Sequence, residues 1–299
     1  MRRPPRENRK MACCRRGAFP VKWIALWRPA SRSRRAIPML KLGCVPHLNA
    51  RPLAIAFEAD PGVALAYDPP SRLAQGLAEG RFDAALMPVI DCFREERFCI
   101  VPGVAIASRG RIESVRLFHK KPLADCRFIG LDQHSASSNA LLEVLLRTRY
   151  GLAPVLETAD PSTGSLHQSH FDAFLCIGDS AFHPAYQSLD AIDLGEEWEA
   201  WQKLPFVYAA WVTARPDGLG DLKNRFIAAR EAGLARAPAI AEEAARRFRL
   251  DPAFVRAYLT RLVRYDLGPD EERGLLRFNE LAAALGLCPR RTEIHEYIG

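Results

Sequence analysis

The chain has 299 residues, of which 48% are hydrophobic and 26% charged. This composition is typical of a globular protein and excludes a disordered, collagen-like or coiled-coil architecture. Its longest nearly apolar run, 99–107, is far shorter than the roughly 18 residues that a membrane-spanning helix needs, so we expect no membrane segment. The net charge of +7 is uneven: residues 1–38 carry +11 and the remainder −4. The body therefore lacks the excess of basic residues that a nucleic-acid-binding face requires, and we expect no nucleic-acid partner.

Residues 1–38 are rich in Arg and Pro and show no hydrophobic period. Their short apolar stretch contains Lys22 and lacks a good cleavage site, so it is a poor export signal. We expect either a disordered basic extension or an over-long start, with the true start at Met39. The body has no C-x-x-C pair, which predicts reduced, buried thiols and a cytoplasmic location.

From residue 39 onward, short apolar strands alternate with helices. Such alternation predicts a parallel sheet that is covered on both faces. Asn49 can cap the first helix and Ser71 the second. The expected strands are 40–45, 63–67 and 83–87, and the expected helices are 51–58, 72–79 and 90–96.

A different rhythm follows. Two long apolar stretches, 99–108 and 205–213, enclose a second α/β unit, and the chain after Pro216 is predicted to be helical to its end. Within that unit, a polar loop leads into an amphipathic helix, 140–150, that Gly151 stops. Four further strands are expected at 114–118, 127–131, 155–158 and 174–177.

This order predicts an α/β protein of two lobes joined by two crossing strands, with a cleft between the lobes. The first lobe would comprise 39–120 plus 205–299, and the second 121–204. Two-lobed proteins of this kind can close on a ligand by hinge motion. The ligand of an open α/β sheet lies beyond the carboxyl ends of its strands, so we looked for polar residues there.

The loop after the strand 127–131 carries the clearest signal. Ser135, Ser137, Ser138 and Asn139 lie at the start of a helix. Free backbone N–H groups and the helix dipole make such a start favourable for an anion, and the hydroxyls add donors. Helix capping by Ser135 or Ser137 alone is the alternative explanation.

Other strand ends offer fewer candidates. Gly178 and Asp179 follow the strand 174–177, where Asp179 could cap the next turn or face a ligand. His47 and Asn49 follow the first strand. We find no phosphate-binding loop, dinucleotide fingerprint or nucleophile elbow, and we expect no cofactor and no metal site. The residues alone thus indicate a protein that closes on a small anion, either a solute-binding protein or an enzyme.

Several stretches resemble one enzyme family. The first is Gly43-Cys44-Val45-Pro46-His47-Leu48-Asn49-Ala50-Arg51-Pro52-Leu53. The second runs from Asp193-Leu194-Gly195 through Trp198 to Leu204-Pro205-Phe206-Val207. Together with 100–106, 110–118 and 177–179, they make the chain similar to the chorismate dehydratases of the futalosine route to menaquinone. This resemblance covers nearly all of 39–299 and implies a type II periplasmic-binding-protein-like fold.

The resemblance also implies a reaction and roles for particular residues. Water would be eliminated from chorismate to give 3-[(1-carboxyvinyl)oxy]benzoate, with the substrate's own enolpyruvyl carboxylate as a possible base. Asn49 would bind the substrate near its reacting centre, and Ser137 with Ser138 would hold a carboxylate. His47 takes the place of a family aromatic residue, and Val89 takes the place of an active-site serine.

Two alternatives stay open beside this function. One is the dihydroxynaphthoate-forming enzyme of the same fold and pathway, and the other is a non-catalytic protein that binds a small anion. The expected partner in each case is a small molecule, and the sequence leaves the oligomeric state undetermined.

Overall fold

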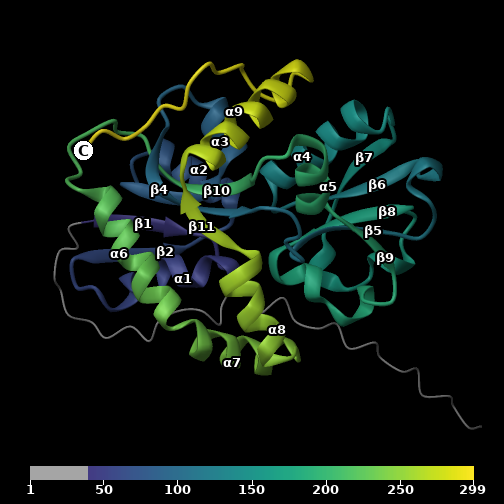
Figure 1. The fold of residues 1–299 in the computed structure, drawn as a ribbon, viewed down its shortest axis with the longest axis horizontal. Helices are drawn as coiled ribbons and strands as arrows, with labels where there is room; N and C mark the ends of the chain where they lie inside the picture. Colours follow the sequence, from purple (N-terminus) through teal and green to yellow (C-terminus); the bar gives the residue numbers. More distant parts are fainter. Residues whose placement is uncertain (1–39) are drawn as a thin grey trace, which may run out of the picture.

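The computed structural model describes residues 40–299, which form two β-sheets with helices packed around them (Figure 1). The expectations for 1–38 and for a start at Met39 therefore lie outside the described residues. In this part of the chain the larger sheet has six strands in the order β11-β4-β10-β3-β1-β2, and we call the lobe built on it the first lobe. Its strands are β1 (Leu40–Cys44), β2 (Val63–Tyr67), β3 (Ala84–Pro88), β4 (Cys99–Ser108), β10 (Phe206–Thr213) and β11 (Arg264–Leu267).

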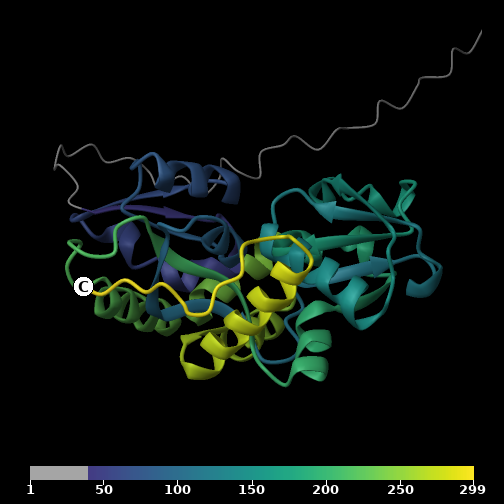
Figure 2. The same ribbon diagram turned by 90° about the horizontal axis from the view of Figure 1, so that it is seen from above.

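The smaller sheet defines the second lobe and lies beside the first lobe in both views (Figures 1 and 2). Its strand order is β7-β6-β8-β5-β9. These strands are β5 (Val115–His119), β6 (Phe128–Asp132), β7 (Val155–Ala159), β8 (Ala173–Ile177) and β9 (Asp190–Asp193). The helices of both lobes are α1 (Arg51–Ala54), α2 (Pro70–Ala78), α3 (Val89–Arg94), α4 (Ala136–Val144), α5 (Leu194–Gln202), α6 (Leu222–Ala235), α7 (Ala237–Phe248), α8 (Pro252–Ala257) and α9 (Pro269–Ala284).

The first three strands pair as the sequence predicts. β1 is parallel to both β2 and β3, and the carboxyl ends of these strands face the second lobe. The remainder of the first sheet is antiparallel, because β10 pairs antiparallel with β3 on one side and with β4 on the other. The long apolar strands β4 and β10 are buried because they occupy the middle of the sheet.

Three expectations about the elements were wrong. The strand β5 was assigned to the first lobe, but it pairs antiparallel with β8 and β9, so the boundary at residue 120 falls one strand too late. The chain after Pro216 is not helical throughout, because β11 pairs with β4 and the segment after α9 runs beside Ile100 as an extended strap. Ser71 does not cap a helix, since α2 already begins at Pro70 with Pro69 as its N-cap.

Two short connections, 109–114 and 203–205, join the lobes, and α5 holds both of them. The Asp193 carboxylate accepts hydrogen bonds from the N–H groups of Ile112 and Glu113 at 3.0 and 2.7 Å, and it also caps α5. At the other connection, the Trp198 indole donates to the carbonyl of Pro205 at 3.1 Å. We call α5 with Asp193 the hinge helix.

Candidate active site

A pocket lies between the lobes, at the carboxyl ends of β1, β3 and β8. About 520 Å³ of space lies inside it, a volume that includes open solvent at its mouth. Among the described residues, no Arg, Lys, Asp or Glu lines it. The lining residues are Val45, His47, Asn49, Pro70, Pro88, Ile106, Ile112, Ser114, Val115, His134, Ser135, Ser137, Ser138, Ile177, Gly178, Tyr208 and Ala209.

One wall of the pocket is the start of α4. This helix begins at Ala136, four residues earlier than expected, because the Ser135 hydroxyl caps it by accepting a hydrogen bond from the N–H of Ser138 at 3.3 Å. Ser137 and Ser138 therefore lie in its first turn, where the N–H groups and the helix dipole favour an anion. Without a basic side chain in the pocket, this helix start is the feature best suited to a carboxylate.

Asn139 does not line the pocket. Its amide donates to the carbonyl of Asp132 at 2.8 Å and ties the helix start to the end of β6. The Asp132 carboxylate in turn accepts from the N–H groups of His134 and Ile177, at 2.9 and 3.1 Å. Burial raises the pKa of Asp132 to about 7. These residues lie behind the residues that line the pocket, and ligand contact by Asn139 stays a prediction.

Asn49 reaches the pocket from a 3₁₀ turn, Leu48–Ala50, that follows β1. It caps no helix, since α1 has Ala50 at its N-cap and no side-chain cap. The capping explanation for Asn49 was therefore wrong, and its amide remains available to a ligand.

His47 and Gly178 meet across the lobes at the edge of the pocket. Gly178 has φ of 54°, and a Cβ built on it would lie 3.0 Å from the His47 ring nitrogen Nδ1. A glycine is thus needed both for the backbone conformation and for the close approach of the ring. Burial lowers the pKa of His47, so the imidazole is neutral at pH 7 and adds no positive charge to the pocket.

Two hydrogen bonds close the lobes on each other. Asp179 accepts from the N–H of Leu48 at 3.0 Å, and the Ser137 hydroxyl accepts from the N–H of Ile90 at 3.2 Å. Asp179 neither caps the next turn nor lines the pocket. Its carboxylate instead holds the two lobes together, and burial raises its pKa.

Val89, the position of the family serine, is the first residue of α3 and is fully buried. Only its neighbour Pro88 lines the pocket, so a substrate contact by Val89 is not seen. Ser114, His134 and Tyr208 also line the pocket, and none of them was among the predicted site residues. Ser114 ends the first connection, and its position could be found only once the strand β5 had been placed in the second sheet.

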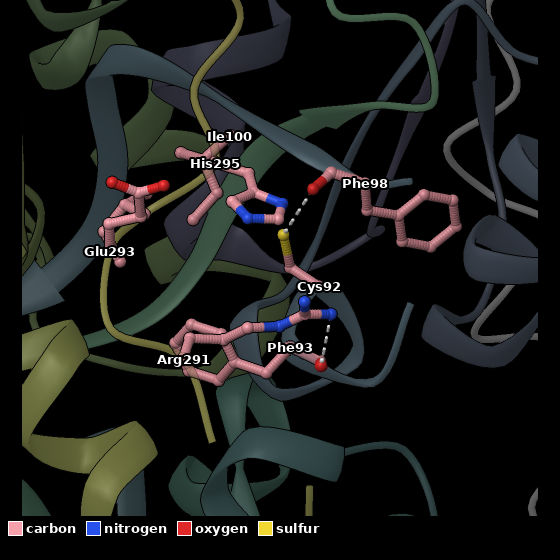
Figure 3. A pocket seen from close by; sticks show the side chains of 8 residues that line it. Cys92, Phe93, Phe98, Ile100, Arg291, Glu293 and His295 are labelled. Carbon is pink, nitrogen blue, oxygen red and sulfur yellow. Dashed lines mark hydrogen bonds between the residues drawn. The ribbon is translucent and has the colours of Figure 1, made fainter. Parts of the chain in front are cut away.

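A second hollow lies under the strap that follows α9 (Figure 3). Arg291 of the strap donates to the carbonyl of Phe93 there, which fixes the strap on the first lobe, and Cys92 donates to the carbonyl of Phe98 within the first lobe. Its polar groups serve this packing. Cys92 and the other five described cysteines are free and buried, as expected, while Cys13 and Cys14 lie outside the described residues.

No helix formed by residues 40–299 has the length and apolar character to span a membrane. In the same residues, no group of three or more His, Cys, Asp or Glu side chains is arranged to hold a metal ion.

Solved structures show the class of fold. A protein of Archaeoglobus fulgidus superimposes with a TM-score of 0.65 at 17% identity, over 83% of this chain and 98% of that one. An alkanesulfonate-binding protein of Xanthomonas axonopodis pv. citri bound to MOPS gives 0.61 at 15% identity, over 87% and 97%. The chain therefore has the two-lobed periplasmic-binding-protein-like fold that the sequence predicts.

The family follows from sequence comparison. The family described as menaquinone biosynthesis matches residues 40–284. The chorismate dehydratase of Thermus thermophilus is 33% identical in an alignment of 207 residues that covers 63% of this chain and 73% of that relative. The chain belongs to the menaquinone biosynthesis family, and the resemblance seen in its sequence is confirmed.

Proposed function

We propose that this protein is a chorismate dehydratase, a hydro-lyase that removes water from chorismate. The observation that carries the proposal is the interlobe pocket, in which the start of α4 faces Asn49 inside a chain of this family. The product would be 3-[(1-carboxyvinyl)oxy]benzoate, a precursor in menaquinone biosynthesis.

The chemistry suits a pocket without acidic or basic side chains. Loss of water turns the ring of chorismate into an aromatic ring, so the elimination is strongly downhill. A site for such a reaction must mainly orient the substrate and exclude water, which can lower a barrier by several kcal/mol. The substrate's enolpyruvyl carboxylate can take the proton, and this would explain why the pocket holds no carboxylate of its own.

Each wall of the pocket has a role in this proposal. Ser137, Ser138 and the first-turn N–H groups of α4 hold a carboxylate of the substrate, and Asn49 binds near the reacting carbon. The hydrogen bonds of Asp179 and Ser137 to the first lobe keep the lobes closed around the ring. The proposal includes a cytoplasmic location, which the free described cysteines support.

The direct test is to incubate the purified protein with chorismate and to follow substrate and product by mass spectrometry. We expect conversion to the dehydrated product without added cofactor, and a large loss of conversion in the Asn49→Ala variant. Binding of chorismate without turnover would instead support a non-catalytic anion-binding protein. Turnover of a later naphthalene precursor, with none of chorismate, would support the dihydroxynaphthoate-forming enzyme.

A further inference from the structure

Asp132 is a buried acidic residue that neither the proposed reaction nor helix capping explains. It is 1% exposed and does not line the pocket. Within residues 40–299 it forms no ion pair with a basic side chain, and burial of an acidic group without such a pair is costly. The other two buried acids of this part of the chain, Asp193 and Glu271, cap α5 and α9. Asp132 precedes α4, but Ser135 caps that helix.

The carboxylate of Asp132 connects two strands where their backbone pairing has ended. β6 and β8 are parallel neighbours, and their last registered pair is Gly130 with Phe174. Beyond this pair, the Asp132 carboxylate accepts a hydrogen bond from the N–H of Ile177 at 3.1 Å. Ile177 and the Gly178 that follows it line the pocket. The side chain of Asp132 therefore fixes the end of β8 at the point where the strands separate and the pocket opens.

The same residue also fixes the start of α4. The other oxygen of its carboxylate accepts from the N–H of His134 at 2.9 Å. Its backbone carbonyl accepts from the N–H of Ser135 at 3.2 Å and from the Asn139 amide at 2.8 Å. His134 and Ser135 line the pocket directly before the first turn of α4. Two separate parts of the second-lobe wall, the α4 start and the β8 end, are thus held by one buried residue.

We propose that Asp132 is a positioning residue for the carboxylate site, which holds the α4 start and the β8 end in the arrangement that binds the substrate. The inference rests on the proposed function, in which the α4 start holds a carboxylate of chorismate. A site that is already ordered binds more tightly than one that the ligand must order, because less conformational entropy is lost on binding. A donor set on a loop needs such support from behind, since its geometry is otherwise loose.

The proposal predicts a particular kinetic signature. A carboxylate that takes no part in bond breaking is present in chorismate, in the transition state and in the product alike. Loss of its binding site should therefore raise the KM for chorismate and the inhibition constant of the product together, and leave kcat nearly unchanged. A variant that is merely less stable would instead lose active protein, which lowers the apparent kcat and leaves both constants as they are.

The test compares Asp132→Ala and Asp132→Asn with the wild type. Asp132→Ala removes both acceptor oxygens, and we expect KM and the product inhibition constant to rise about tenfold, with kcat changed less than about threefold. Asp132→Asn keeps the shape of the side chain and one acceptor oxygen, so both constants should rise by a smaller factor. This order of the two variants is the rescue that a positioning role requires.

Asp172→Ala is the matched control, because Asp172 makes similar contacts at the opposite end of β6. Its carboxylate accepts from the N–H groups of Arg127 and Phe128, at 2.7 and 3.1 Å, and it lies outside the pocket lining. This variant should leave KM and the product inhibition constant at their wild-type values.

Unchanged constants in a folded Asp132→Ala would overturn the positioning role and leave the proposed function intact. An equal rise in Asp172→Ala would also overturn it, since any loosening of the second lobe would then weaken binding. Should Asp132→Ala fail to fold, Asp132→Asn decides the question, and wild-type constants in that variant would refute the role. A wild-type protein that neither binds nor converts chorismate would overturn the proposed function, and the role of Asp132 with it.

Discussion

Asn49 and Asn139 carry the same amide group, but the protein uses the two groups differently. The Asn139 amide donates within the protein, to the carbonyl of Asp132. The Oδ1 atoms of both side chains are buried without a hydrogen-bond partner among the described residues, but only Asn49 lines the pocket. Asn49 is therefore the one of the two that can bind a ligand there.

This contrast gives a paired prediction. Asn49→Ala should leave the free energy of unfolding within about 1 kcal/mol of the wild type, because Asn49 caps no helix. Its turnover of chorismate should fall at least about 100-fold, the scale for one positioned polar group in an active site. Asn139→Ala should have the opposite pattern. It should lower the unfolding free energy by about 1 kcal/mol and change turnover little. Thermal unfolding and steady-state kinetics on both variants check the pair, and an active Asn49→Ala enzyme would contradict it.

Asp132 predicts a dependence of stability on pH. Its pKa is about 7 in the folded protein and 3.8 in a model peptide, so between these values the folded state holds a proton that the unfolded state has released. Its contribution to stability is therefore largest at low pH and is lost as the pH rises toward about 7. Asp132→Asn removes this titration. The unfolding free energy of the wild type should fall relative to that of the variant as the pH rises from about 4 to 7, and a constant difference would refute the assignment.

Sequence patterns could identify some of these residues and not others. Ser135, Ser137 and Ser138 are adjacent in the sequence, so their excess of hydroxyls before a helix is visible without a structure. Ser114 and Tyr208 both line the pocket but are separated by more than ninety residues, and no local sequence pattern marks them as neighbours. They come together only because the second lobe is inserted within the first.

At the scale of elements, the first turn of α4 divides three serines among three tasks. All three line the pocket, but Ser135 also caps the helix and Ser137 also accepts a hydrogen bond from the first lobe. We assign Ser138 to the ligand. The three serines are nearly adjacent in the sequence, so the role of each depends on the direction in which its side chain points from the start of α4.

This division predicts different losses on replacement by alanine. Ser135→Ala should lower the unfolding free energy by about 0.5–2 kcal/mol, the usual cost of a lost cap. Ser138→Ala should leave stability nearly unchanged and weaken chorismate binding by about 1–3 kcal/mol, because a hydrogen bond to a charged group is lost. Thermal unfolding and the KM for chorismate separate the two. Unchanged binding in a folded Ser138→Ala would remove Ser138 from the anion site.

Element prediction succeeded where local pattern and tertiary environment agree. β1, β2 and β3 are short apolar runs between turn residues, and their positions are predicted to within a residue. β11 was missed because it is short and because charged residues alternate with Tyr and Leu in Arg264–Leu267. This segment forms a strand by pairing with β4. The start of α4 was placed too late because the serines that make up its first turn are poor helix formers taken alone.

The hinge helix makes a further prediction. A Cβ on Gly195 would lie 2.6 Å from the carbonyl oxygen of Gly110 and 2.6 Å from the Tyr208 hydroxyl. Because the first of these atoms is backbone, Gly195→Ala must displace the first connection, at a cost of about 1–3 kcal/mol in unfolding free energy. Calorimetry measures this, and a variant as stable as the wild type would show that α5 is free to shift.

For the whole molecule, closure rests on few polar contacts. Asp179→Ala removes the acceptor of the Leu48 N–H and should shift the free protein toward an open form. We expect a larger radius of gyration by small-angle scattering and a KM for chorismate about tenfold higher, the effect of about one hydrogen bond. Asp179→Asn keeps an oxygen acceptor and should resemble the wild type. An Asp179→Ala variant as compact as the wild type would show that apolar contacts alone hold the lobes together.

The central place of β10 in the first sheet has a consequence for how the chain is made. On the ribosome, β1 to β4 emerge first, but β3 and β4 must wait for β10, which is synthesised only after the whole second sheet. The second lobe can therefore complete its sheet while the first still has strand edges open to aggregation. Translation order and folding order run opposite to each other here, and a nascent chain stopped before residue 206 contains one finished lobe and one that needs protection by a chaperone.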